Sequence, residues 1–370
     1  MKGNSRTTHA GTKVAIGVGL AIGWCACFSR APVASDPVVR PADSSSGVDA
    51  VNALADAEKL AEKAVRLREA GDYEGAASAT ERALALRQAS LAPDHPLVVT
   101  SLLALAWCRA KQYDYSRSQV LASRALALLQ AKGRPRDPQI AEAAHLLALE
   151  ALNRRDFVAA KRLFWWAEEL LQDRPESAAY AELLNDLAIA YLGDGDPSRA
   201  ERVFRHALAV AGRVESAPLL LSDIQGGIAE SLRHQRKDSE AEPFYLESLR
   251  IRAARFPPDH PSLAAPLNNL AAFYHYRKHD LPRAEPLYRR ALGIYAAKLS
   301  PDHIRTAQVR INLGLLLCEA GEWDAGERLF RQGIDRFEAV MGPEHRDVND
   351  TRAYFEKLMR ARDNPIPKVP

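Results

Sequence analysis

A short phrase, Pro-Asp-His or Pro-Glu-His, recurs along this chain. Its four copies lie at 93–95, 258–260, 301–303 and 343–345. The last three are 43 and 42 residues apart, counted from His260 to His303 and from His303 to His345. A fixed period of about 40 residues is typical of a repeat array, in which each unit buries its apolar face against the next. We therefore expect one continuous array in these 370 residues and not several separate globular domains.

The segments between these phrases favour helices. They are rich in Ala and Leu with helical spacing, and none alternates as a strand would. They divide into helix pairs at turn signals such as Gly71 and Gly321. The first helices of the pairs are expected at 51–69, 97–111, 138–153, 177–192, 218–235, 261–277 and 304–320. The second helices are expected at 73–90, 115–131, 156–172, 197–211, 238–255, 281–298 and 323–340.

The repeated phrase is interpreted as the turn between pairs, where Asp would cap the following helix and Pro would begin it. A catalytic or metal-binding role is disfavoured, because the copies lie a repeat length or more apart and line up along the array. Two repeats are longer than the others. The second carries about two extra residues around 113–118, and the sixth carries one near 278–280.

Small residues recur where the helices of a regular array must approach closely. On the first helices they are Ala64, Ala104, Ala148, Ala188, Ala229, Ala271 and Gly314. Early on the second helices they are Ala76, Ser118, Ala160, Ala200, Ala241, Ala284 and Gly326. Seven residues later they are Ala83, Ala125, Ala167, Ala207, Ser248, Ala291 and Gly333. Large apolar and aromatic side chains occupy the positions between them and are expected to form the core between helices.

This pattern resembles the tetratricopeptide repeat, in the longer form of about 42 residues found in kinesin light chains and many bacterial proteins. The stretches LNNLAAFY at 267–274 and AEPLYRRAL at 284–292 match best. The resemblance covers 50–342 and implies an all-α fold, a right-handed superhelical α-solenoid of about seven helix pairs. One more amphipathic helix at 346–360 is expected to cap the last pair.

The N-terminus is expected to be a separate segment. Three basic residues precede an uncharged run of 16 residues at 14–29, short for a membrane span of about 20 but suited to an export signal. A cleaved signal is favoured. An uncleaved membrane anchor, a lipoprotein modified at Cys25 or Cys27, and an artefact of the chosen start remain open. The expected segments are 1–29 as signal or anchor, 30–48 as a disordered Pro/Ser-rich linker, 49–342 as the array, 343–363 as the capping helix and 364–370 as a disordered tail.

Several classes of function are disfavoured. The net charge of +3 and the lack of a basic stripe with interleaved aromatics argue against nucleic acid. No nucleophile–base pair or phosphate-binding loop is evident, so neither an enzyme nor a cofactor is expected. His275 and His279 have the i, i+4 spacing of metal ligands, but no further ligand lies within the same turn, and no metal is expected. The four cysteines suggest no disulfide framework.

A groove along the first helices is the candidate binding site. Asn185, Asn268, Asn269 and Asn312 lie within predicted helices, where Asn is a poor helix former, so some compensating use is expected. The resemblance implies that Asn269 and Asn312 hydrogen-bond the backbone of a peptide; a contact between adjacent helices is the alternative. The other candidates are Glu182, Asp223, Glu230, His145, Tyr276 and Gln308. The Lys/Asn/Arg clamp by which some relatives bind C-terminal carboxylates is not reproduced.

These observations predict a non-enzymatic scaffold that binds a peptide or partner helix, exported to the periplasm or cell envelope. A ligand-responsive regulator in the cytoplasm or at the membrane is the alternative. The sequence identifies neither the partner nor the oligomeric state.

Overall fold

The computed structural model describes residues 47–363, apart from 70, 71, 113, 134, 135, 174, 175, 215–217 and 300. Its described part is helical and contains no strand. The first helices of the pairs are α1 (Gly47–Glu69), α3 (Pro96–Lys111), α5 (Pro138–Asn153), α7 (Ala178–Gly193), α9 (Pro218–His234), α11 (Ala264–Phe273) and α13 (Ile304–Glu319). The second are α2 (Tyr73–Ser90), α4 (Tyr115–Ala131), α6 (Phe157–Leu171), α8 (Pro197–Ala211), α10 (Asp238–Ala253), α12 (Leu281–Lys298) and α14 (Trp323–Met341).

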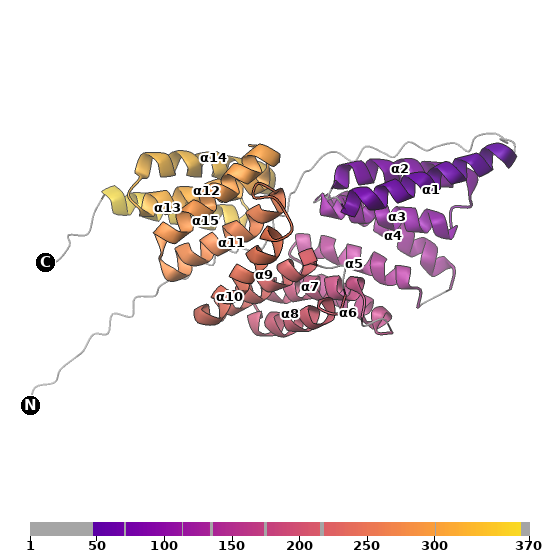
Figure 1. Cartoon of the computed structure of the whole chain (residues 1–370), viewed down its shortest axis with the longest axis horizontal. Helices are drawn as coiled ribbons and strands as arrows, with labels where there is room; N and C mark the ends of the chain where they lie inside the picture. Colours follow the sequence, from indigo (N-terminus) through magenta and orange to yellow (C-terminus); the bar gives the residue numbers. More distant parts are fainter. Residues whose placement is uncertain are drawn as a thin grey trace, which may run out of the picture.

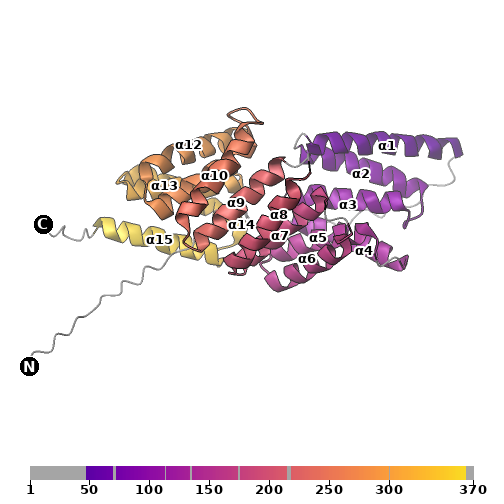
Figure 2. The same ribbon diagram turned by 60° about the horizontal axis from the view of Figure 1, so that its bottom comes forward.

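The helices stack in chain order from α1 and α2 at one end to α13 and α14 at the other, which makes the fold a helical solenoid (Figures 1 and 2). A last helix, α15 (Arg346–Asp363), packs on α13 and α14, as expected of a cap. The first helix begins at Gly47, inside the segment expected to be a linker. The predicted signal at 1–29 and the tail at 364–370 lie outside the described residues.

Aspartates begin most of the second helices. In each case the carboxylate accepts a hydrogen bond from the backbone N–H three residues further on, which satisfies one of the amides that a helix start leaves unpaired. These capping residues are Asp72, Asp114, Asp156, Asp196 and Asp280.

The repeated Pro-Asp-His phrase caps its helices differently from the expectation. His95 Nδ1 accepts a hydrogen bond from the amide of Leu97 at 3.2 Å, and His260, His303 and His345 do the same two residues ahead. The prediction that the aspartate is the cap is wrong for this phrase. Instead, Asp94 Oδ2 lies 3.8 Å from Lys132 Nζ, and Asp259 Oδ2 lies 3.1 Å from Lys298 Nζ. The phrase therefore links the start of the first helix to the end of the second helix of the same pair.

The predicted small-residue positions form the contact surfaces of the array, and all of them except Ala104 are buried. The last pair is the closest packed. A Cβ atom on Gly314 would lie 2.7 Å from both the carbonyl oxygen of Gly326 and the amide nitrogen of Phe330. Glycine is required there because the two backbones touch. The large side chains between these positions, including Phe164, Phe204 and Tyr288, are fully buried and form the predicted core.

The extra residue of the sixth repeat is absorbed by a π-helical turn, η2 (Tyr274–Lys278), that follows α11. The next residue, His279, closes this turn with a left-handed backbone at φ 51°. His275 is completely buried, whereas His279 is exposed. The π turn therefore breaks the i, i+4 register on which a two-histidine metal site would depend.

Candidate functional site

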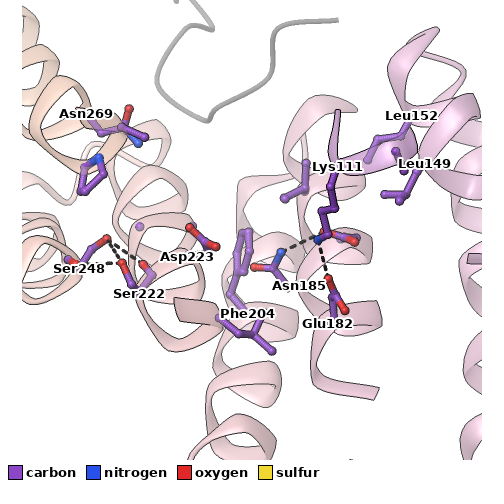
Figure 3. Close-up of a pocket in the computed structure, with 18 of the residues that line it drawn as sticks. Lys111, Leu149, Leu152, Glu182, Asn185, Phe204, Ser222, Asp223, Ser248 and Asn269 are labelled. Carbon is purple, nitrogen blue, oxygen red and sulfur yellow. Dashed lines mark hydrogen bonds and ion pairs between the residues drawn. The ribbon is translucent and has the colours of Figure 1, made fainter. Parts of the chain in front are cut away.

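A cavity of about 420 Å³ opens between the first helices, with walls from α5, α7, α9 and α11. Figure 3 shows it with ten of its residues labelled. Its volume lies within the range of small-ligand sites, about 300–1,000 Å³. Four predicted groove residues line this central cavity: Glu182, Asn185, Asp223 and Asn269.

Polar side chains pair in the same register at two junctions between adjacent first helices, α5 with α7 and α11 with α13. His145 Nε2 of α5 lies 2.8 Å from Asp186 Oδ2 of α7. Asn312 Nδ2 of α13 donates to Asn268 Oδ1 of α11 at 3.1 Å. His145 and Asn268 each lie three residues before the small residue of their own helix, Ala148 and Ala271. Each contacts the residue that lies two before the small residue of the next first helix. We call this series of contacts the polar row.

Helix α9 interrupts the polar row, because Gly226 and Gly227 occupy both of its positions. Asn185 on one side and Asn269 on the other therefore have no counterpart on α9. Asn185 Nδ2 donates to Asp186 Oδ1 at 3.0 Å, but its own Oδ1 is buried and has no hydrogen-bond partner. Both glycines line the central cavity, so the cavity coincides with the gap in the row.

The two glycines leave different amounts of space. A Cβ atom on Gly227 would lie 2.3 Å from the ring of Phe204, which fills this position. A Cβ atom on Gly226 would meet nothing nearer than Ser248 Oγ at 3.6 Å. The space in front of Gly226 is thus open.

One wall of the cavity carries two carboxylates, Glu182 and Asp186, both from α7. Lys111 Nζ at the end of α3 donates to Glu182 Oε1 at 2.6 Å, and both side chains are about one third exposed. Burial would raise the pKa of Glu182, but the charges of Lys111 and His145 outweigh it and hold that pKa below its usual range. Asp186 of α7 lines the same side, whereas Glu142 of α5 interacts electrostatically with Glu182 from outside the lining. We call Glu182 and Asp186 the acidic wall.

The opposite side of the cavity is charge-balanced. Arg252 of α10 pairs with Asp223 and donates to Ser222 Oγ at 2.7 Å. Ser222 Oγ in turn donates to the carbonyl oxygen of Ser248 at 2.8 Å. Arg305 of α13 lines the same side. These contacts tie α9 to α10 and leave no excess of negative charge there.

Three of the remaining candidates form a buried amide cluster between α11 and α13. Asn312 is 1% exposed, and Gln308 Nε2 donates to its Oδ1 at 3.4 Å while Asn268 accepts from its Nδ2. The alternative of a contact between adjacent helices therefore holds for Asn268 and Asn312 in this structure. The hydrogen bonds to a peptide that are expected of Asn269 and Asn312 remain a prediction.

Glu230 and Tyr276 also lie away from the cavity lining. Glu230 is buried beside Arg233 and accepts from the hydroxyl of Tyr245 at 2.5 Å. Burial would raise the pKa of Glu230, but the charges of Arg233 and His234 outweigh it and lower that pKa far below its usual range. Tyr276 stacks on His275 in the π turn, with ring centroids 4.0 Å apart.

Three further residues of the cavity, Lys111, Phe204 and Arg252, were not predicted from the sequence to lie at a binding site. Lys111 ends its helix, and Phe204 and Arg252 lie on second helices, so their approach to the cavity follows from the superhelical stacking. Gly226 and Gly227 are adjacent in the sequence, but their meaning depends on the register of the polar pairs on either side. Among the described residues no group of three metal-ligating side chains comes together, and no described helix has the length and apolarity of a membrane span.

The comparisons with known proteins agree with this architecture. Two tetratricopeptide repeat family models match, one at residues 220–297 and 263–339, the other at 60–97 and 181–217, together more than half of the chain. The chain belongs to the tetratricopeptide repeat family. A search of curated proteins gives no match.

Solved structures share the fold at low sequence identity. A Rap protein complexed with Competence and Sporulation Factor has a TM-score of 0.61 at 15% identity, covering 84% of this chain and 88% of its own. NprR in complex with its cognate peptide NprX has a TM-score of 0.55 at 17% identity, covering 85% of each chain. A putative kinesin light chain repeat protein of Podosopora anserina has a TM-score of 0.42 at 18% identity, covering 53% of this chain and 94% of its own.

Proposed function

We propose that this protein is a non-enzymatic scaffold that binds an extended peptide segment of a partner in the central cavity. The observation that carries the proposal is the gap in the polar row at Gly226 and Gly227. It leaves Asn185 with a buried, unpartnered acceptor and Asn269 with an amide at the opposite side of the same cavity.

A peptide group suits this gap chemically. Each peptide unit offers one N–H donor and one C=O acceptor, both of which need partners when they leave water. An N–H would satisfy Asn185 Oδ1, and a C=O would accept from the Asn269 amide. The bound segment thereby takes the place of the side chain that α9 lacks at Gly226. Two structures of similar fold are described as complexes, one with Competence and Sporulation Factor and one with a cognate peptide, and the second supports this class of ligand.

The proposal is tested by selecting binders from a random peptide display pool on the purified protein. Hydrogen–deuterium exchange with the best enriched peptide then maps its contact surface. We expect protection of α7, α9 and α11. Protection confined to the second helices α4, α12 and α14, or no enrichment at all, would contradict the proposal.

We also propose that the array acts outside the cytoplasm, on the support of the apolar run at 14–29. A phosphatase reporter that is active only outside the cytoplasm should be active when it is fused after residue 48. A fusion that is expressed but inactive would instead favour the ligand-responsive regulator in the cytoplasm.

A further inference from the structure

We infer that the acidic wall binds a cationic side chain, a guanidinium or an ammonium, carried by the peptide segment in the cavity. The inference rests on the proposed function and specifies the chemistry of its ligand. Three independent features of the cavity support it: its charge balance, its unpartnered acceptors and the position of Lys111.

At the cavity surface the charge balance of the acidic wall is negative. Glu182 and Asp186 line the cavity, and Lys111 is the one cation among the lining residues of α3, α5 and α7. His145, which pairs with Asp186 at 2.8 Å, and Arg68, which acts on Glu182, lie behind this lining. A cation entering the cavity would therefore meet these two carboxylates directly, and opposite charges in a partly enclosed site are screened less than on an open surface.

Two buried acceptors beside this wall lack donors. Asn185 is 7% exposed and its Oδ1 has no hydrogen-bond partner; Asn153 Oδ1 is likewise buried and unpartnered. Both residues line the central cavity. The orientation of the Asn185 amide is fixed, because its Nδ2 donates to Asp186. Figure 3 shows Asn185 between Phe204 and the pair of Lys111 and Glu182. A group with several N–H donors would satisfy acceptors that now carry a desolvation cost.

Lys111 already shows the chemistry that the wall accepts. Its ammonium donates to Glu182 and interacts with Asp186, and these two carboxylates outweigh burial and raise the pKa of Lys111. Its long side chain is partly exposed and also lies 4.8 Å from the ring centroid of Trp107, which offers it a second position. A ligand cation would therefore compete with Lys111 for Glu182.

The charges on the opposite side of the cavity determine the orientation of the bound peptide. Asp223 is already paired with Arg252, and Arg305 lies nearby, so a cation gains little there. A bound segment should place its basic residue against α5 and α7.

The test uses the peptide display pool on the wild-type full chain, followed by titration calorimetry of synthetic peptides. Enriched sequences should carry Arg or Lys at one register. Replacing that Arg by citrulline, which keeps its shape and loses its charge, should weaken binding about tenfold. The double variant Glu182→Gln, Asp186→Asn should bind both peptides equally.

A third variant guards against misfolding as an explanation. Lys111→Met removes the internal competitor and should bind the Arg peptide about tenfold more tightly, an effect that a damaged fold cannot produce. Enriched peptides without a basic residue, or an Arg peptide that Lys111→Met binds more weakly, would overturn the cation site while leaving the proposed peptide binding intact. Failure to enrich any peptide would overturn both.

Discussion

Asn185 on α7 and Asn312 on α13 are the same residue type on equivalent helices, yet their surroundings differ. Asn312 is hydrogen-bonded to Asn268 of the preceding first helix and is 1% exposed. The α9 position that Asn185 would pair with is Gly227, beside which the ring of Phe204 lies, and Asn185 Oδ1 has no partner. The neighbouring repeat decides whether such an asparagine holds two helices together or lines a cavity.

The largest expected effect separates buried carboxylates from those of the cavity. Glu230→Gln should lower the free energy of unfolding by about 3 kcal/mol, because it leaves the largely buried Arg233 guanidinium without its charge partner. Glu182→Gln should cost less than about 1 kcal/mol, because its pair with Lys111 is partly exposed. Urea denaturation of both variants gives the comparison. Equal losses would show that the cavity pair is as structural as the buried one.

The same carboxylates predict a dependence on pH. The pKa of Glu230 is lowered in the folded protein, so its contribution to stability is complete above the unfolded pKa of about 4.3 and is lost as the pH falls below it. The wild-type protein should lose more stability than Glu230→Gln between pH 5 and pH 3, about the range in which an unfolded glutamate takes up its proton. Thermal melts of both proteins across this pH range would measure the difference. An identical dependence of the melting temperature on pH in the two proteins would argue against the pairing of Glu230 with Arg233.

Two glycines provide the next contrast. Gly314→Ala should destabilise by about 2 kcal/mol or more, because the new Cβ would lie 2.7 Å from backbone atoms of α14. Gly226→Ala should stabilise by about 0.5–1 kcal/mol, because alanine is the better helix former and the space is open. Thermal unfolding of the two single variants checks both signs. A destabilised Gly226→Ala would mean that the gap is closed in solution.

The smallest expected difference in stability is the one between the two asparagine variants. Asn312→Ala should cost about 1–2 kcal/mol, because Asn268 Oδ1 would lose its buried donor. Asn185→Ala should cost about 0.5 kcal/mol less, because Asn185 makes one donor bond, to Asp186, and its Oδ1 is already unpaired. Denaturant midpoints measured side by side would show the order, and a reversed order would remove the distinction drawn between the two repeats.

The sequence predicts most of the fold because the array is periodic. Helix bounds, the buried small residues and the capping helix follow from residues that recur once per repeat. The histidine cap of the Pro-Asp-His phrase was missed, because Asp94 and His95 are adjacent polar residues and the geometry of the turn selects between them. The π turn at Tyr274–Lys278 was detected as an extra residue, but its form was not.

The candidate site was less predictable, because it arises from contacts between repeats. The sequence shows Asn185 and Asn269 as unusual helix residues. It does not show which positions of neighbouring first helices are in contact, as Asn268 and Asn312 are. Once that register is known from Asn268 and Asn312, the gap at α9 follows.

The central claim is that a ligand occupies the gap in front of Gly226. Gly226→Asn should fill the gap by pairing with Asn269, as Asn268 pairs with Asn312, and should leave stability within about 0.5 kcal/mol of wild type. The matched control is Gly293→Asn on α12, an exposed helical glycine with open space around it. Titration calorimetry with the peptide selected on wild type should show binding at least about tenfold weaker for Gly226→Asn and unchanged for Gly293→Asn. Equal affinity in all three proteins would contradict the account.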